Sequence, residues 1–134
     1  MAAPILCARD LQFMLYELFD AESLIKRPRY ADHSVETFNA AIDTAQSIAE
    51  KYFVPIRKKV DEQQPTFDGK NVHMIPENKV AVDAATQAGF VSSTADFELG
   101  GMQLPPLVAS AANAYLTAAA STTTGYLALS NANA

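Results

Sequence analysis

The sequence predicts an all-α fold built around one hydrophobic core, and three observations carry that prediction. Apolar residues recur every three or four positions over most of the chain, which is the spacing of a helix that packs on one side. No alternation of apolar and polar residues persists long enough to demand a sheet. The chain of 134 residues is 49% hydrophobic, which is typical of an ordinary globular domain.

The N-terminal 33 residues are predicted to form a short helical extension. Between Arg9 and Phe19 the apolar residues fall at helical spacing, and Asp10 is a candidate N-cap for this helix. A further turn or two is expected after Asp20, and Pro28 should end it because proline cannot continue a helix.

A long helix is predicted after Ser34. Its apolar stripe consists of Val35, Phe38, Ile42, Ala45, Ala49, Tyr52, Ile56 and Val60. At 3.6 residues per turn this stripe spans about seven turns. Pro55 lies inside the stripe, and because proline has no N–H it should kink the axis near Lys51. The stripe continues beyond the proline, so we expect one bent helix.

The segment 63–75 is polar and is predicted to be a loop with a tight turn at Asp68-Gly69. A helix should begin at Pro76, since proline is favoured in the first helical turn. Gly89 is expected to end this helix in the left-handed conformation that glycine adopts without strain.

The last third of the chain is predicted to be a loop followed by two helices. Residues 90–102 are expected to be extended or looped, with a flexible turn at Gly100-Gly101. One helix should begin near Pro105-Pro106, and another should begin near Ser121 and continue to Ala134.

The charge distribution divides the chain into two unlike parts. The net charge is −5, yet the 36 residues from Leu99 to Ala134 contain no charged side chain. A small independent domain normally ends in charged, solvated residues. Polar residues interrupt every window long enough to span a membrane, so no membrane span is predicted. We therefore expect further polypeptide to cover this stretch, and we expect the isolated chain to form a homo-oligomer.

The composition argues against several functions. An acidic chain with only short basic runs does not favour nucleic-acid binding. The single cysteine, Cys7, excludes an internal disulfide and any cysteine-cluster metal site, and it fits a reducing, cytoplasmic compartment. His33 and His73 are about forty positions apart and are interpreted as surface histidines, so no metal site is expected. No nucleophile elbow, phosphate loop or dinucleotide fingerprint occurs.

One segment carries a family resemblance. After Ala-Gly-Phe-Val at 88–91, the chain reads Asp-Phe-Glu-Leu-Gly-Gly-Met-Gln-Leu-Pro at 96–105. This resembles the loop of acyl-CoA dehydrogenases, which usually reads Pro-x-Glu-x-Gly-Gly-x-Gly. Glu98, Gly100 and Gly101 match that pattern. The proline of that pattern is not present here, and Gln103 stands where the third glycine is expected, which indicates a distant or specialised member.

The resemblance extends upstream. The sequence Glu-Lys-Tyr-Phe-Val-Pro-Ile-Arg at 50–57, with Asp61, is similar to the first long helix of the family. Ala3-Pro4, Asp10, Phe13 and Glu17 are similar to the additional N-terminal helices of the subgroup that includes methylthiopropanoyl-CoA dehydrogenases. The resemblance therefore implies an N-terminal extension at 1–33 and the N-terminal α-domain of the family at 34–134.

The resemblance implies a function only for a complete protein: oxidation of an acyl-CoA to the 2,3-enoyl-CoA, with FAD as hydride acceptor and electron-transfer flavoprotein as the next acceptor. In the family a middle β-domain with a Thr-Glu-Pro-x-Ala-Gly-Ser strand holds most of the flavin. The catalytic glutamate lies in a C-terminal helical domain. Neither segment is present in these residues, so we assign no catalytic residue and expect the 134-residue chain to lack tight flavin binding and activity.

What these residues would supply is one wall of the acyl pocket, because the family's helix after the Gly-Gly loop lies beside the acyl tail. By position this implies Thr124, Gly125, Ala128 and Ala132 as wall residues. Three of them are very small, which leaves volume for a longer or bulkier acyl group. Close packing of helices explains the same small residues equally well.

Two further hypotheses complete the interpretation. The resemblance implies a structural role for the loop residues Glu98, Gly100 and Gly101, with a structural hydrogen bond expected for Glu98 in place of a role as catalytic base. The alternative to an enzyme fragment is a self-standing helical module that buries its uncharged face by oligomerising.

Overall fold

The computed structural model describes the backbone of residues 4–131 and the side chains as far as Leu129. Helices dominate, and the described part of the chain has only one small sheet, an antiparallel pair of two-residue strands, β1 (Thr66–Phe67) and β2 (Val72–His73). The all-α prediction is confirmed apart from this pair. None of the described helices is long and apolar enough to cross a bilayer.

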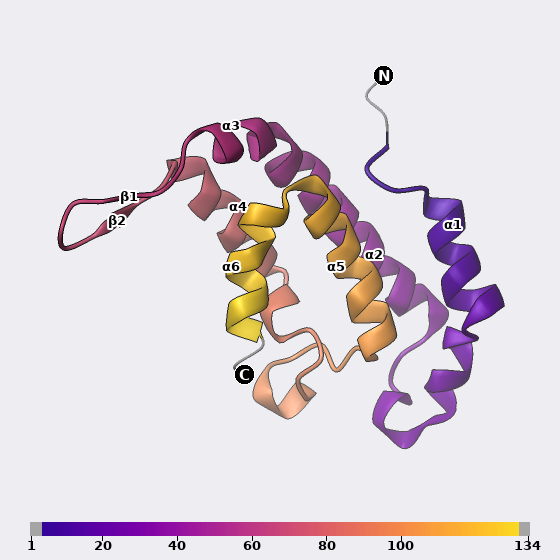
Figure 1. The fold of residues 1–134 in the computed structure, drawn as a ribbon. Helices are drawn as coiled ribbons and strands as arrows, with labels where there is room; N and C mark the ends of the chain where they lie inside the picture. The colour runs from indigo at the N-terminus through magenta and orange to yellow at the C-terminus, as the bar shows by residue number, and fades with distance from the viewer. Residues whose placement is uncertain (1–3, 132–134) are drawn as a thin grey trace.

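The core lies among four helical segments (Figure 1). Helix α5 (Pro106–Ala119) packs along α2 (Val35–Ile48), and α6 (Ser121–Asn131) packs against both α5 and α4 (Pro76–Gln87). The most deeply buried large side chains include Phe38, Phe53, Leu104, Val108, Tyr115 and Leu116. This arrangement makes α5 the central helix of the chain.

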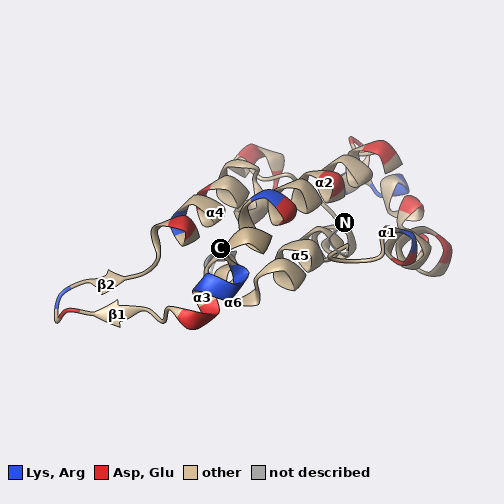
Figure 2. Cartoon of the chain, turned by 90° about the horizontal axis from the view of Figure 1, so that it is seen from above, with Lys and Arg blue, Asp and Glu red and all other residues tan. Residues whose placement is uncertain are grey.

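The uncharged C-terminal stretch is partly explained by this core. The face of α5 that carries Val108, Ala112 and Tyr115 is buried against α2 within the same chain. The charged residues gather on the other elements (Figure 2). This face of α5 therefore needs no further polypeptide to cover it, and the expectation of such a cover now rests on the outer face of α6, where Leu129 is exposed.

The N-terminal extension consists of α1 (Ala8–Gln12), a π-helical continuation (Phe13–Leu18) and two short 3-10 segments (Ala21–Lys26 and Pro28–Tyr30). Its helix begins before Asp10, with Cys7 at the N-cap position, so the predicted cap is wrong and Asp10 lies in the first turn. The extension is attached to α2 where Tyr16 Oη donates a hydrogen bond of 2.7 Å to Asn39 Oδ1.

The predicted long helix is continuous, but its hydrogen-bonding pattern changes around Pro55. Helix α2 begins with a capping box in which Ser34 and Thr37 exchange hydrogen bonds. It passes through a π-helical turn (Ala49–Phe53) and a 3-10 turn (Val54–Ile56) into α3 (Arg57–Glu62). Because Pro55 has no N–H to donate, the regular pattern breaks at this point while the chain remains helical.

The segment 63–75 departs from its prediction as a loop. It forms a hairpin that projects from the body of the molecule (Figure 1), with the predicted Asp68-Gly69 turn at its tip. Asp68 Oδ1 accepts hydrogen bonds from the N–H groups of Lys70 and Asn71 at 2.8 and 2.7 Å, which closes the turn. The predicted ends of α4 are confirmed, with Pro76 in its first turn and Gly89 following it at φ +88°.

Candidate functional site

The Gly-Gly loop, defined here as residues 96–103, requires its two glycines for different reasons. Gly100 has a φ of +79° and ends a short 3-10 turn (Phe97–Leu99) in the left-handed region. Gly101 lies against the backbone, because a Cβ at this position would be 2.1 Å from the carbonyl oxygen of Ala95. The predicted structural role of this pair therefore has a geometric basis in both residues.

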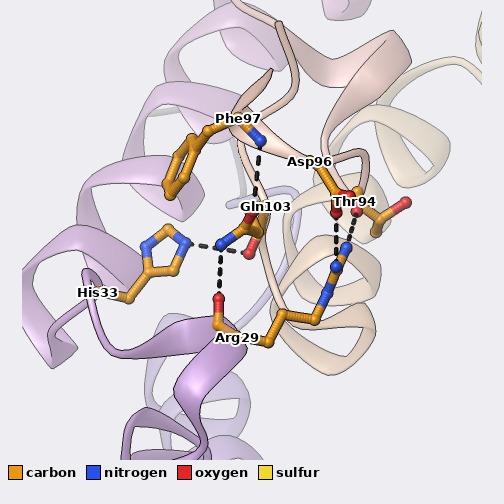
Figure 3. Close-up of polar contacts among 6 residues, drawn as sticks. All are labelled: Arg29, His33, Thr94, Asp96, Phe97 and Gln103. Carbon is orange, nitrogen blue, oxygen red and sulfur yellow. Dashed lines mark hydrogen bonds and ion pairs between the residues drawn. The ribbon is translucent and has the colours of Figure 1, made fainter. Parts of the chain in front are cut away.

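Gln103 occupies the position where the family pattern has its third glycine, and its φ is +49°. A left-handed conformation costs a residue other than glycine about 1–3 kcal/mol. The side chain offsets this strain with two hydrogen bonds, because Nε2 donates to the carbonyl of Arg29 at 2.5 Å and Oε1 accepts from the N–H of Phe97 at 3.3 Å (Figure 3). Gln103 thus joins the N-terminal extension to the Gly-Gly loop.

Arg29 and His33 make further contacts with the Gly-Gly loop, and we call the contacts of these two residues with Thr94, Asp96 and Gln103 the junction. The Arg29 guanidinium pairs with Asp96 at 2.5 Å and donates to the carbonyl of Thr94 at 3.2 Å, and the hydrogen bond to Asp96 raises the pKa of Arg29. Both partners of this pair are about half exposed, so its net stabilisation is small. His33 Nε2 lies 3.0 Å from the carbonyl oxygen of Gln103. The interpretation of His33 as a surface histidine missed this contact with a residue 70 positions away.

The junction fixes the neighbouring segment 92–95. The N–H groups of Met102 and Leu104 donate to the carbonyls of Ser92 and Ser93 at 3.3 and 2.9 Å. The N–H of Gln103 donates to the carbonyl of Ala95 at 2.9 Å. With its carbonyl groups held in this way, the segment forms a rigid edge beside the start of α5.

This edge borders a hollow of about 380 Å³ between the segment 90–94, α5 and the end of α6. The described residues that line it are Phe90, Ser93, Thr94, Pro106, Ala109, Ser110, Asn113, Leu116, Leu127 and Ala128. Five of these recur at helical spacing along α5, on the side away from α2. Four of the ten are polar, the other six are apolar, and none is charged.

Only one of the four residues predicted to form the acyl-pocket wall is among the described residues that line this hollow. Ala128 lines it. Thr124 is buried and its Oγ1 donates to the carbonyl of Ala120 at 3.0 Å, within its own helix. Gly125 is half-buried, and a Cβ on it would meet no atom within 4 Å. Ala132 lies outside the described residues. The assignment of these four residues to an acyl pocket stays a prediction.

Glu98 is exposed in the short turn of the Gly-Gly loop. Within the described part of the chain its side chain makes no hydrogen bond or ion pair. The bonds that fix this loop come instead from Gln103, from Asp96 and from the backbone. Sequence reasoning noted Gln103 at the third glycine position but gave neither Gln103 nor Arg29 a role at this site, although that unusual residue was the available signal.

The hollow does not fit the flavin dinucleotide that the family resemblance implies. A diphosphate needs cationic side chains or the N–H groups of a glycine-rich turn. No described lining residue is Lys or Arg, and the Gly-Gly loop lies outside the lining. We therefore derive no chemistry from a flavin in this hollow.

Fold and site together define a small helical domain with an uncharged, mostly apolar hollow beside a Gly-Gly loop. Over 102 residues, 75% of this chain, the sequence is 29% identical to the broad-specificity linear acyl-CoA dehydrogenase FadE5 of Mycobacterium tuberculosis. This stretch covers 17% of the length of that relative, so the chain spans only a small part of it. No protein-family model matches the chain, and neither does any solved structure. The similarity supports the acyl-CoA dehydrogenase family, and it leaves the subgroup open.

Proposed function

We propose that this chain is the N-terminal helical part of an FAD-dependent acyl-CoA dehydrogenase, which oxidises an acyl-CoA to the 2,3-enoyl-CoA. The similarity to FadE5 over three quarters of the chain carries this proposal. The Gly-Gly loop supports it further, because Gly100 and Gly101 match the family pattern, Gly100 adopts a φ of +79°, and Gly101 has no room for a Cβ beside the Ala95 carbonyl. The finer assignment to the methylthiopropanoyl-CoA dehydrogenase-like subgroup, with residues 1–33 as its extension, is part of the proposal.

The role of these residues in the longer protein is to position the acyl group. Ala128 on α6 presents a small side chain to the hollow, and Thr124, Gly125 and Ala132 belong to the same proposed wall. The flavin, the catalytic base and the contact with electron-transfer flavoprotein belong to other parts of the longer protein. A homo-oligomer in the cytoplasm is the proposed state of that protein.

The direct test is to read the encoding gene beyond the codon for Ala134. We expect an in-frame continuation into a strand similar to Thr-Glu-Pro-x-Ala-Gly-Ser. We also expect the 134-residue chain to be purified without flavin absorbance, and the extended protein to be purified with it. Flavin bound tightly to the 134-residue chain would contradict our assignment of the cofactor to the missing segments.

A second test addresses the wall. In the extended protein, Ala128→Phe should fill much of the hollow and lower kcat/KM for long acyl-CoA substrates by about 10-fold or more relative to short ones. Ala118→Phe is the matched control, because Ala118 is exposed on α5 and does not line the hollow. Equal effects of both substitutions on every chain length would remove Ala128 from the proposed wall.

The rival is a helical module that acts only by association, and one observation favours it. The projecting hairpin exposes 68% of Phe67 and 63% of Val72, an apolar cross-strand pair. A stop codon directly after Ala134 and a stable homo-oligomer in sedimentation would support this module. A monomer in sedimentation would count against both the rival and the expected self-association.

A further inference from the structure

The hollow beside α5 is bordered by the hydroxyl group of a nearly buried serine, and this hydroxyl has no hydrogen-bond partner among the described residues. Ser93 is 4% exposed and lines the hollow. Its side chain makes no hydrogen bond to another described residue. No described side-chain nitrogen or oxygen that is sealed from solvent lacks a partner, so the Ser93 hydroxyl must keep access to open space. The open space that it borders is the hollow.

Two more polar side chains face the same space. Ser110 and Asn113 lie one turn apart on α5, and both line the hollow. Neither side chain has a hydrogen-bond partner in the described part of the chain. The other walls are apolar and include Phe90, Leu116 and Leu127. An apolar hollow with a few convergent polar groups is the usual form of a small-molecule site.

The electrostatics of the hollow favour a neutral occupant. None of the described lining residues is charged, so an ion would lose its hydration without gaining a counter-charge. Helix α5 lines the hollow along its side from Pro106 to Leu116, and α6 lines it with Leu127 and Ala128. The two helices run in opposite directions (Figure 1), so their dipoles are opposed. These opposed dipoles largely cancel, and neither an anion nor a cation is selected.

We propose that the hollow binds an uncharged hydrogen-bonding group, a primary amide or a hydroxyl, at the end of a short aliphatic chain. The Ser93 hydroxyl is its deepest hydrogen-bond partner, and Ser110 and Asn113 bind it from α5. A volume of about 380 Å³ is at the small end of the range for ligand pockets and accommodates such a group. Because backbone hydrogen bonds fix the segment 92–95, Ser93 is held in place before the ligand arrives.

For the enzyme, this inference rests on the proposed function. Ala128 belongs both to the hollow and to the proposed acyl wall, so the bound group becomes the far end of the acyl chain. The substrate class is then an acyl-CoA whose acyl group ends in a neutral polar substituent. A plain alkyl end would leave the Ser93 hydroxyl without a partner, which the polar end avoids.

The test uses the 134-residue chain and three probes of equal length: pentanamide, pentanoate and pentylammonium. Backbone amide chemical shifts are followed by NMR during each titration. We expect pentanamide to shift the resonances of residues 90–94 and 109–116, with a dissociation constant of about 10 mM, as befits so small a ligand. The two charged probes should bind about 10-fold more weakly or not at all. Equal binding of all three probes would overturn the proposal, as would shifts spread over the whole chain.

Substitutions in the hollow test which side chains bind pentanamide. Ser93→Ala should weaken pentanamide binding by about 5-fold, and Asn113→Ala, at an exposed position that folding does not depend on, by about 3-fold. Ser92→Ala is the matched control, because the neighbouring serine does not line the hollow, and it should change nothing. Unchanged binding in both Ser93→Ala and Asn113→Ala would exclude the assigned hydrogen bonds.

The two proposals fail separately. If pentanamide binds as expected while the gene stops after Ala134, the site stands and the dehydrogenase assignment falls. If the gene continues into the flavin-binding strand and pentanamide does not bind, the dehydrogenase assignment stands and the polar-ended substrate class falls.

Discussion

Two segments of equal length, the hairpin 66–73 and the Gly-Gly loop 96–103, both reverse the direction of the chain, but they are held by different kinds of hydrogen bond. Each reverses the chain with a glycine at positive φ. The polar side-chain bonds within the hairpin reach no further than five residues, from Asp68 to His73. Those that Gln103 of the Gly-Gly loop makes with His33 and Arg29 reach 70 and 74 residues along the chain.

A segment can hold a site in place only if it is bonded to distant parts of the fold. A locally bonded hairpin of two-residue strands is marginal in water and depends little on the rest of the fold. A loop bonded to distant segments is fixed only when the whole domain is folded, and it then holds its neighbours rigidly. The hollow lies beside the second kind of loop, since that loop holds the carbonyl groups of Ser92 and Ala95, on either side of Ser93.

The largest expected effect comes from Gly101→Ala. Its Cβ would collide with the Ala95 carbonyl, so the loop and the edge of the hollow must move, which should lower the free energy of unfolding by about 3 kcal/mol. Urea denaturation measures this change. Gly69→Ala is the matched control in the hairpin, where a Cβ meets nothing within 4 Å and only the φ of +98° is strained. Its cost should fall on the hairpin alone and leave the urea midpoint nearly unchanged. Equal midpoints for the two variants would refute the distinction between the loops.

Thr123→Val and Thr124→Val extend the comparison to adjacent buried threonines on α6. Thr123 Oγ1 donates at 2.8 Å to Asn78 Oδ1 on α4, whereas Thr124 Oγ1 bonds only to its own helix. Valine has nearly the same shape, so each substitution removes the hydroxyl and its hydrogen bond with little change in packing volume. Thr123→Val should cost about 1–3 kcal/mol because a buried acceptor on another helix is left unpaired. Thr124→Val should cost less than about 1 kcal/mol. Thermal unfolding of both variants checks the order, and the reverse order would contradict it.

The ends of the elements could be predicted because their signals are local. Ser34, Pro76, Gly89 and Pro106 each determine the conformation of their own turn, and the structure places helix ends at all four. The hairpin could not be predicted from alternation, since strands of two residues are too short to show a period.

The hollow and its edge could not be predicted because their contacts are not local. Nothing in the sequence near Ser93 indicates that its hydroxyl will face α5 without a partner. The bonds from Gln103 to Arg29 join residues 74 positions apart. Similarly, the uncharged face of α5 indicated a partner, but the sequence did not reveal that α2 of the same chain is that partner.

Substitutions at Gln103 test whether its side-chain hydrogen bonds offset the strain of its left-handed backbone conformation. Gln103→Ala keeps the left-handed φ and loses both side-chain bonds, which should destabilise the chain by about 1–2 kcal/mol. Gln103→Gly loses the same bonds but relieves the strain, so it should be about 1 kcal/mol more stable than the alanine variant. Both should speed proteolysis within residues 20–33, because this segment loses one of the bonds that hold it to the Gly-Gly loop. An alanine variant as stable as the glycine variant would mean that no strain is stored there.

The smallest effect concerns pH and the turn of the hairpin. Hydrogen bonds from the backbone of Asn71, then the contact with His73, lower the pKa of Asp68 to about 2. Because the pKa is lower in the folded turn than the value of about 3.9 in an unfolded chain, its stabilising contribution is complete above that value. It is lost as the pH falls through about 2.

Carbon NMR of the Asp68 carboxyl group should therefore give a midpoint near 2, and cross-strand contacts between Thr66 and His73 should persist at pH 3. Asp68→Asn should remove the pH dependence of the hairpin, and the Gly-Gly loop signals should not follow this titration, since Asp68 makes no contact with that loop. A shared midpoint in the two segments would show that they are coupled, contrary to the local bonding of the hairpin.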